Sequence, residues 1–274
     1  MFEFCSLASG SSGNSSLLIL GGETLLVDAG IPLKRIEERL LEKNISPASI
    51  GRLLITHAHG DHIKSAGKLA RKYRMPVWLT RATCAEAQKL GCDLADCQLN
   101  FLREKEKFGS LKVKTFQVPH DEAGNTGFLF EHSGFRAAYF TDLGALPERI
   151  YRDIHDCDFL FLEANHDVLR EKTSRRPARI IERNLSDRGH LSNEQAARIV
   201  ARVVRGEASR KTRAVMLAHI SKDCNHHVFV EKTIRAALRQ KQAAETIKIL
   251  LAPEGRCSEH LRWPLAATPV YLKK

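Results

Sequence analysis

Several features that would assign a protein to a familiar class are missing from this chain. No run approaches the roughly 18 uninterrupted apolar residues of a membrane-spanning helix. The opening residues MFEFCSLASGSSGNSS have no basic segment ahead of an apolar core, so no secretory signal is predicted. No Gly-x-Gly-x-x-Gly or Walker A pattern is present, which disfavours a nucleotide cofactor. We therefore expect a cytoplasmic protein without a membrane partner.

Cysteine is present, but in no arrangement that suggests chemistry. The seven cysteines are an odd number, and none forms a C-x-x-C pair. A disulfide framework or a thiolate zinc cluster needs cysteines in regular pairs. We expect inert thiols in a reducing compartment.

Size and composition fit one folded domain. A chain of 274 residues, 43% hydrophobic and 27% charged, suits a single α/β domain over residues 1–274 and can bury a large core. Lys and Arg number 43 against 32 Asp and Glu, which gives a formal charge of +11. A field of that sign attracts polyanions such as nucleic acid. A basic surface alone also occurs in proteins with no such partner.

Strand and helix patterns alternate irregularly in two halves. FEFCSLA and SLLILGG, joined by the Gly/Ser loop SGSSGN, predict a β-hairpin, and ETLLVDAG predicts a strand that ends at Asp28. LKRIEERLLEK has apolar residues at helical spacing, and SNEQAARIVARVV begins with the capping-box pair Ser192 and Gln195. LKVKTFQVP, FRAAYFTD, FLFLEAN and AVMLAH predict further strands. This order favours two packed sheets with helices outside over one doubly wound parallel sheet.

A histidine-rich loop follows the short predicted strand GRLLIT. It places His57, His59, Asp61 and His62 within six positions. Zinc-like divalent ions bind imidazole nitrogen and carboxylate oxygen at about 2.0 to 2.2 Å. A single histidine is usually structural, but four such side chains at one strand end predict a metal site.

The loop resembles the H-x-H-x-D-H signature of the metallo-β-lactamase superfamily. The other motifs of that superfamily follow in order: LLVDAG with Asp28, VPHD with His120, YFTDLG with Asp142 and MLAHIS with His219. The resemblance covers most of the chain. It implies an α/β fold of four αββα layers, in which two mixed sheets lie inside and helices lie outside. Asp28 is expected to orient a ligand or the loop, without binding a metal itself.

The resemblance also implies two divalent metal ions. Their ligands would be His57, His59, Asp61, His62, His120, Asp142 and His219. One ion would take His57, His59 and His120, the other Asp61, His62 and His219, with Asp142 between them. Two such ions can turn a bridging water into hydroxide near neutral pH and stabilise charge on the scissile group. Zinc and manganese are the expected metals, with iron as a further candidate.

Three further segments concern the substrate. LEANHD, GHLSNEQAARI and LAHIS resemble the phosphodiesterase branch of the superfamily, which includes ribonuclease Z. In that branch the histidine matched by His190 contacts the scissile phosphate and can protonate the leaving oxygen, and the acid matched by Glu163 orients it. Asp61, His190 and Glu163 are therefore the expected catalytic residues. The plain alternative for His190 is a surface residue ahead of the helix cap at Ser192.

LASGSSGNSS, EANHD, GHLSN and LAHISKDCN together resemble the YycJ (WalJ)-like nucleases, small enzymes of this fold. This resemblance implies a metal-dependent DNA exonuclease associated with DNA repair, with 5′ to 3′ as the polarity to test. Ser11, Ser12 and Asn14 of the Gly/Ser loop are candidate phosphate donors. Arg175 and Arg176, in the basic run LREKTSRRPARIIERNLSDRGH, are candidate phosphate contacts.

Two other functions stay open. A small-molecule hydrolase, either a cyclic phosphodiesterase or a thioesterase related to hydroxyacylglutathione hydrolase, would use the same metals. A nucleic-acid-binding protein without catalysis would bind DNA in a salt-sensitive way and show no metal-dependent turnover. The interval between Asp142 and His219 is too short for the cap domain of large β-CASP nucleases, which weakens a specific RNA-processing assignment.

Overall fold

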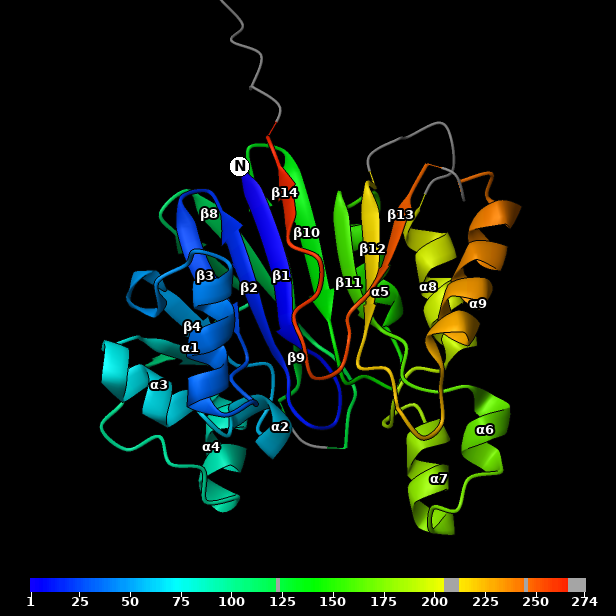
Figure 1. The fold of residues 1–274 in the computed structure, drawn as a ribbon, viewed down its shortest axis with the longest axis horizontal. Helices are drawn as coiled ribbons and strands as arrows, with labels where there is room; N and C mark the ends of the chain where they lie inside the picture. The colour runs from blue at the N-terminus through cyan, green and yellow to red at the C-terminus, as the bar shows by residue number, and fades with distance from the viewer. Residues whose placement is uncertain (122–123, 205–211, 244–245, 266–274) are drawn as a thin grey trace, which may run out of the picture.

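Two β-sheets form the centre of the molecule (Figure 1). A computed structural model describes residues 1–121, 124–204, 212–243 and 246–265. The strands of the first sheet are β1 (Phe2–Ala8), β2 (Ser15–Leu20), β3 (Glu23–Val27), β4 (Arg52–Leu54), β5 (Val77–Leu79), β6 (Leu99–Phe101) and β14 (Leu261–Trp263). Those of the second sheet are β7 (Lys105–Phe108), β8 (Leu111–Gln117), β9 (Thr126–His132), β10 (Phe135–Phe140), β11 (Phe159–Glu163), β12 (Ala214–Ala218) and β13 (Lys248–Leu251).

Both sheets are mixed, and each changes from antiparallel to parallel pairing along its width. The first sheet has the order β14-β1-β2-β3-β4-β5-β6 and the second β13-β12-β11-β10-β9-β8-β7. Pairs between β14 and β3 are antiparallel, and those from β3 to β6 are parallel. In the second sheet the pairs from β7 to β10 are antiparallel, and those from β10 to β13 are parallel. The predicted hairpin of β1 and β2 is confirmed.

Helices flank the two sheets on opposite sides (Figure 1). The first sheet is accompanied by α1 (Leu33–Glu42), α2 (Gly60–Ile63), α3 (Ala66–Tyr73) and α4 (Arg81–Lys89), with a short 3-10 turn η1 (Pro47–Ser49). The second is accompanied by α5 (Glu148–Ile154), α8 (Asn193–Val203) and α9 (His227–Gln240). Two short helices, α6 (Val168–Lys172) and α7 (Ala178–Leu185), project beyond the strand ends. The predicted capping box at Ser192 is confirmed at the start of α8.

Three buried clusters hold these layers together. The central cluster lies between the sheets and contains aromatic side chains from both, among them Phe4 and Phe161, whose ring centres are 5.3 Å apart. Full burial of one such side chain contributes about 1.5 to 3 kcal/mol. Along β10, Tyr139 faces this cluster and Phe140 faces the one under α5, α8 and α9, because neighbouring strand residues point to opposite faces. The third cluster lies under α1, α3 and α4. The predicted αββα arrangement is confirmed.

The parallel strands set the place of the chemistry. Their carboxyl ends lie at one edge of each sheet, where open α/β sheets generally place their ligands. α6 and α7 project from the same end of the molecule as α2 and α4 (Figure 1). Among the described residues, no helix combines the length and the apolar character needed to cross a bilayer.

Candidate metal centre

The predicted metal ligands gather where strands of both sheets end. His57 and His59 lie in the loop after β4, and α2 begins at Gly60 and carries Asp61 and His62. His120 follows β8, Asp142 follows β10 and His219 directly follows β12. The first sheet therefore supplies one part of the candidate centre and the second sheet supplies the rest.

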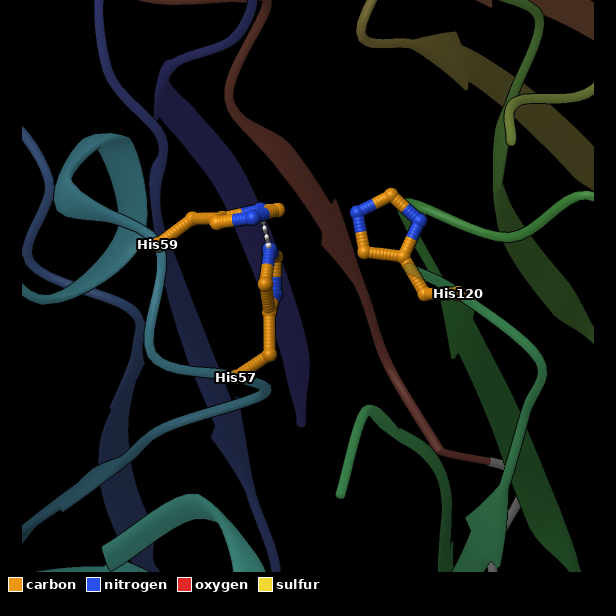
Figure 2. A group of neighbouring side chains, drawn as sticks. All are labelled: His57, His59 and His120. Atoms are coloured by element: carbon orange, nitrogen blue, oxygen red, sulfur yellow. Dashed lines mark hydrogen bonds between the residues drawn. The ribbon is translucent and has the colours of Figure 1, made fainter. Parts of the chain in front are cut away.

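His57, His59 and His120 form the first group. One nitrogen from each ring lies within 4.8 Å of the others. His57 Nε2 is 3.0 Å from His59 Nδ1, and His120 approaches from the opposite side (Figure 2). Burial lowers the pKa values of His57 and His120, which keeps both rings neutral. Neutral imidazoles are the form that binds a metal.

Asp61, His62 and His219 form the second group, whose ligand atoms also lie within 4.8 Å of one another. Asp142 lies beside it, with Oδ2 at 3.1 Å from His62 Nε2 and Oδ1 at 3.2 Å from His219 Nδ1. Asp142 also groups with His57 and His62. It is thus the carboxylate that both groups share.

Protons and metal ions compete for this second group. Burial opposes a charge on His219, but Asp142, Asp61 and Glu163 raise its pKa to about 10. Burial likewise opposes a charge on His62, and Asp142 and Asp28 nevertheless raise its pKa well above the ordinary value. A metal ion bound by these imidazoles would replace their protons.

The ring nitrogens fit such ions. His120 Nδ1 lies 3.1 Å from the Gly189 carbonyl oxygen, and His219 Nδ1 lies 2.8 Å from Glu163 Oε1. In each ring Nε2 is buried and makes no hydrogen bond among the described residues, and Asp121 Oδ1 lies 3.0 Å from that of His120. An N–H on Nδ1 leaves the lone pair on Nε2, so each ring presents a metal-binding atom toward the centre.

Asp28 and Asn14 both contact the ring of His62. Asp28 is fully buried; its Oδ1 accepts one hydrogen bond from the Thr56 backbone N–H at 2.8 Å, and its Oδ2 lies 2.7 Å from His62 Nδ1. This arrangement agrees with the predicted orienting role. Asn14 is buried too, with Nδ2 at 2.9 Å from His62 Nε2. The predicted phosphate contact of Asn14 stays a prediction.

Three of these residues have left-handed backbone conformations. The φ angles are +63° at Asp28, +53° at Asp142 and +51° at His219. A non-glycine residue in this region costs on the order of 1 to 2 kcal/mol. Because each residue comes directly after a strand or one position later, the turn aims its side chain into the centre. The packed sheets on either side support that strain.

Glu163 connects His190 with the candidate ligand His219. Its Oε1 lies 2.8 Å from Nδ1 of both His190 and His219. Its Oε2 accepts the backbone N–H groups of Leu143 and Leu191, both at 3.1 Å. Burial opposes ionisation of Glu163, but His190 and His219 lower its pKa to about 2. A buried carboxylate with four donors orients its neighbours.

A cavity of about 360 Å³ opens over the centre. His190 and His219 line it, together with His59, Asp61, Asp142 and Ser11. Further lining comes from Arg176, in the segment between α6 and α7, and from Ile180, Arg183 and Asn184 of α7. The alternative interpretation of His190 as a surface residue is therefore not supported, because only 13% of its side chain is exposed.

The remaining candidates for phosphate contact differ in setting. Ser12 is exposed and donates to Glu254, whereas Ser11 lines the cavity. Arg175 is exposed outside the cavity. The Arg176 guanidinium binds Glu171 at 3.1 Å, which makes it a structural link as well as a wall residue.

Sequence reasoning missed two residues of the site. Asp121 Oδ1 lies 3.0 Å from His120 Nε2 and 3.5 Å from His59 Nε2, while Oδ2 accepts from Arg183 at 2.9 Å. Asn165 donates to the His219 carbonyl oxygen at 2.9 Å. Their position in the VPHD and LEANHD motifs was the available signal.

The comparisons with known proteins agree with this geometry. A family model described as the beta-lactamase superfamily domain matches residues 23–220. The chain belongs to this superfamily. It is 34% identical to the Exodeoxyribonuclease WalJ of Streptococcus pneumoniae over 87% of this chain and 89% of that protein. It is also 34% identical to the Exodeoxyribonuclease YycJ of Bacillus anthracis, over 87% and 90%.

Solved structures of the superfamily share the fold. The metallo-beta-lactamase fold protein YhfI of Bacillus subtilis has a TM-score of 0.68 at 15% identity and covers 93% of this chain and 98% of its own. Human tRNase Z, short form, has a TM-score of 0.63 at 15% identity over 96% and 100%. Sequence identities this low support a shared fold and nothing further. The predicted fold and the resemblance to the YycJ (WalJ)-like nucleases are confirmed, and the chain is a metal-dependent hydrolase.

Proposed function

We propose that this chain is a two-metal exonuclease that cleaves phosphodiester bonds of DNA. One observation carries the proposal: His190, fastened by Glu163, faces the same cavity as the two groups of metal ligands. A departing alkoxide needs a proton donor beside the metals, and an imidazole supplies one. Lactam or thioester cleavage gives no comparable reason for an imidazole held by a buried carboxylate at this place.

The residues divide the work. Two divalent ions would supply an activated water and neutralise charge on the scissile phosphate. His57, His59 and His120 would hold one ion, Asp61, His62 and His219 the other, and Asp142 both. Glu163 Oε1 accepts the Nδ1–H of His190 at 2.8 Å and orients the ring in the cavity. The proton on Nε2 of His190 then moves to the leaving oxygen.

Three observations support DNA as the substrate. The two bacterial relatives at 34% identity are named exodeoxyribonucleases. The net charge of +11 favours a polyanion. Arg176, between α6 and α7, and Arg183 of α7 line the cavity together with candidate metal ligands. Zinc or manganese, with iron as a further candidate, suits the nitrogen and oxygen donors. We place the enzyme in the cytoplasm, in DNA repair, as a single domain over residues 1–274.

The test is a cleavage assay on metal-quantified protein. Single- and double-stranded DNA labelled at the 5′ or 3′ end, and matched RNA, are incubated with Mn²⁺ or Zn²⁺. The parent is compared with Asp61→Ala, which removes a proposed ligand, and with Asp93→Ala, which removes an exposed carboxylate paired with Arg71. We expect metal-dependent shortening by the parent and Asp93→Ala, and none by Asp61→Ala.

The labels also resolve the finer points. Early release of a labelled 5′ nucleotide indicates 5′ to 3′ polarity, and preference for DNA over RNA sets the substrate class. A protein that binds two metals and cleaves no nucleic acid would refute the nuclease. Small phosphodiesters and thioesters would then be the substrates to examine.

A further inference from the structure

A second hollow lies next to the cavity of the metal centre. It has a volume of about 450 Å³ and is lined by Arg170, Thr173, Ser174, Arg175, Arg176 and Asp223. Arg176 also lines the cavity over the metal centre. The two depressions therefore share one wall residue and form a continuous surface over the helical pair α6 and α7, called the arm below.

Buried polar contacts fix the arm relative to the centre. Glu171 of α6 is fully buried and accepts from Asn184 of α7 at 2.7 Å and from Arg176 at 3.1 Å. The second terminal nitrogen of the Arg176 guanidinium, Nη2, donates to Ser221 Oγ at 3.2 Å, and Ser221 lies two positions after His219. The arm thus holds a set position beside the candidate metal ligands.

Exposed apolar side chains lie on α6 and at the start of α9, and Arg170 connects the two helices. Leu169 of α6 is 70% exposed, and Val228 and Phe229 at the start of α9 are 60% and 37% exposed. The Arg170 guanidinium, which also lines the second hollow, lies 4.7 Å from the centre of the Phe229 ring. We call Leu169, Arg170, Val228 and Phe229 the stacking patch. An aromatic ring and a guanidinium plane are the groups on which nucleic-acid bases stack.

The charges around the hollow complement phosphate. Arg170 and Arg175 are exposed. The acid of the lining, Asp223, is paired with Arg176 at 3.2 Å. The exposed arginines therefore leave an excess of positive charge between the cavity and the stacking patch. A basic groove that leads to a stacking surface suits single-stranded DNA. In a duplex the faces of the bases are stacked on one another and cannot contact protein side chains.

We propose that the second hollow and the stacking patch form a track for a single DNA strand whose end lies in the metal cavity. This inference rests on the proposed nuclease function and adds a substrate form to it. The scissile phosphate lies at the centre, the following backbone passes Arg176 and Arg175, and a base stacks on Arg170 and Phe229. Short substrates that end within the cavity make no contact with the patch.

The experiment measures binding to a long fluorescent single-stranded oligonucleotide. All proteins carry His190→Ala and both metals, so that cleavage is slow during the binding measurement. Phe229→Ala and the double variant Leu169→Ser, Phe229→Ala are compared with Phe101→Ala. Phe101 is a matched control because it is also 37% exposed with a guanidinium, that of Arg81, 4.3 Å from its ring centre, yet it lines neither hollow.

Loss of stacking should weaken single-strand binding about 5- to 100-fold in the Phe229 variants, and Phe101→Ala should match the parent. With His190 restored, the Phe229 variants should cleave a long strand poorly at low concentration and a dinucleotide normally. Parent-like affinity in both Phe229 variants overturns the track, and so does an equal loss for single strands and blunt duplexes. If the parent binds no DNA at all, the nuclease function fails as well.

Discussion

Replacement of Glu163 by Gln tests the network behind the metal ligands. The Glu163 carboxylate is fully buried and receives four donors: Nδ1 of His190 and His219, and the backbone N–H groups of Leu143 and Leu191. A carboxylate has about four lone-pair sites, and all are occupied here. The Gln side chain has the same shape, but its NH₂ group would face N–H donors and cannot accept hydrogen bonds from them.

The size of the effect follows from two independent arguments. Gln leaves two donors unsatisfied in a buried position, at about 1 to 3 kcal/mol each. The depression of the Glu163 pKa from 4.5 to about 2 corresponds to about 3 kcal/mol in favour of the ionised form. We therefore expect Glu163→Gln to lower the free energy of unfolding by about 3 kcal/mol at pH 7, because this value satisfies both arguments.

Urea unfolding of metal-free protein at several pH values measures this loss. A lowered pKa stabilises the fold above the ordinary pKa, and the contribution disappears as the pH falls through the lowered value. The difference between Glu163→Gln and the parent should be largest between about pH 4.5 and 6.5 and shrink as the pH falls toward about 2. It should also shrink as the pH rises toward about 10, because His219 then loses the proton that Glu163 helps to hold.

Glu171→Gln is the matched control, because Glu171 is equally buried but contacts Arg176 and Asn184 in the arm. Both variants should lose stability, and only Glu163→Gln should also bind metal more weakly and lose turnover. A stability difference that persists unchanged down to pH 2, or parent-like turnover in Glu163→Gln, would show that the buried carboxylate does not act as argued.

Three further substitutions address single steps. His190→Ala should leave both metals bound and slow cleavage by about 10² to 10⁴, as measured by single-turnover kinetics, and an unchanged rate removes His190 from the mechanism. Asp61→Ala should lower the metal content by one ion per chain in elemental analysis; two retained ions contradict its place in the second group. Asp121→Asn should weaken metal binding about 10- to 100-fold in chelator competition, because its carboxylate lies beside His59 and His120. If the parent and Asp121→Asn bind metal with equal affinity, Asp121 serves only as the ion-pair partner of Arg183.

The sequence predicted what depends on local patterns. The histidine loop, the hairpin of β1 and β2 and the cap at Ser192 all lie within a few consecutive residues, so their signals are complete in one segment. The candidate ligands His120, Asp142 and His219 were predicted because the short segments VPHD, YFTDLG and MLAHIS resemble motifs of the superfamily. Glu163 was found through its motif, while its four donors come from three separate segments.

The rest depends on contacts between distant segments. β6 and β14 have three residues each and exist through pairing with β5 and β1. α7 lies in an arginine-rich run that was singled out for phosphate contacts, and it is held by the contact of Asn184 with Glu171. Asp121 acquires a role through Arg183, a residue far along the chain. No period or spacing contains such information.

The division of the candidate centre between the two sheets has a consequence for the newly made chain. His57, His59, Asp61 and His62 leave the ribosome first, but they lack His120, Asp142 and His219 until most of the second sheet has been synthesised. Neither proposed ion then has its full set of ligands. A partly made polypeptide therefore cannot degrade nucleic acid in its vicinity, and the activity begins with the completed fold.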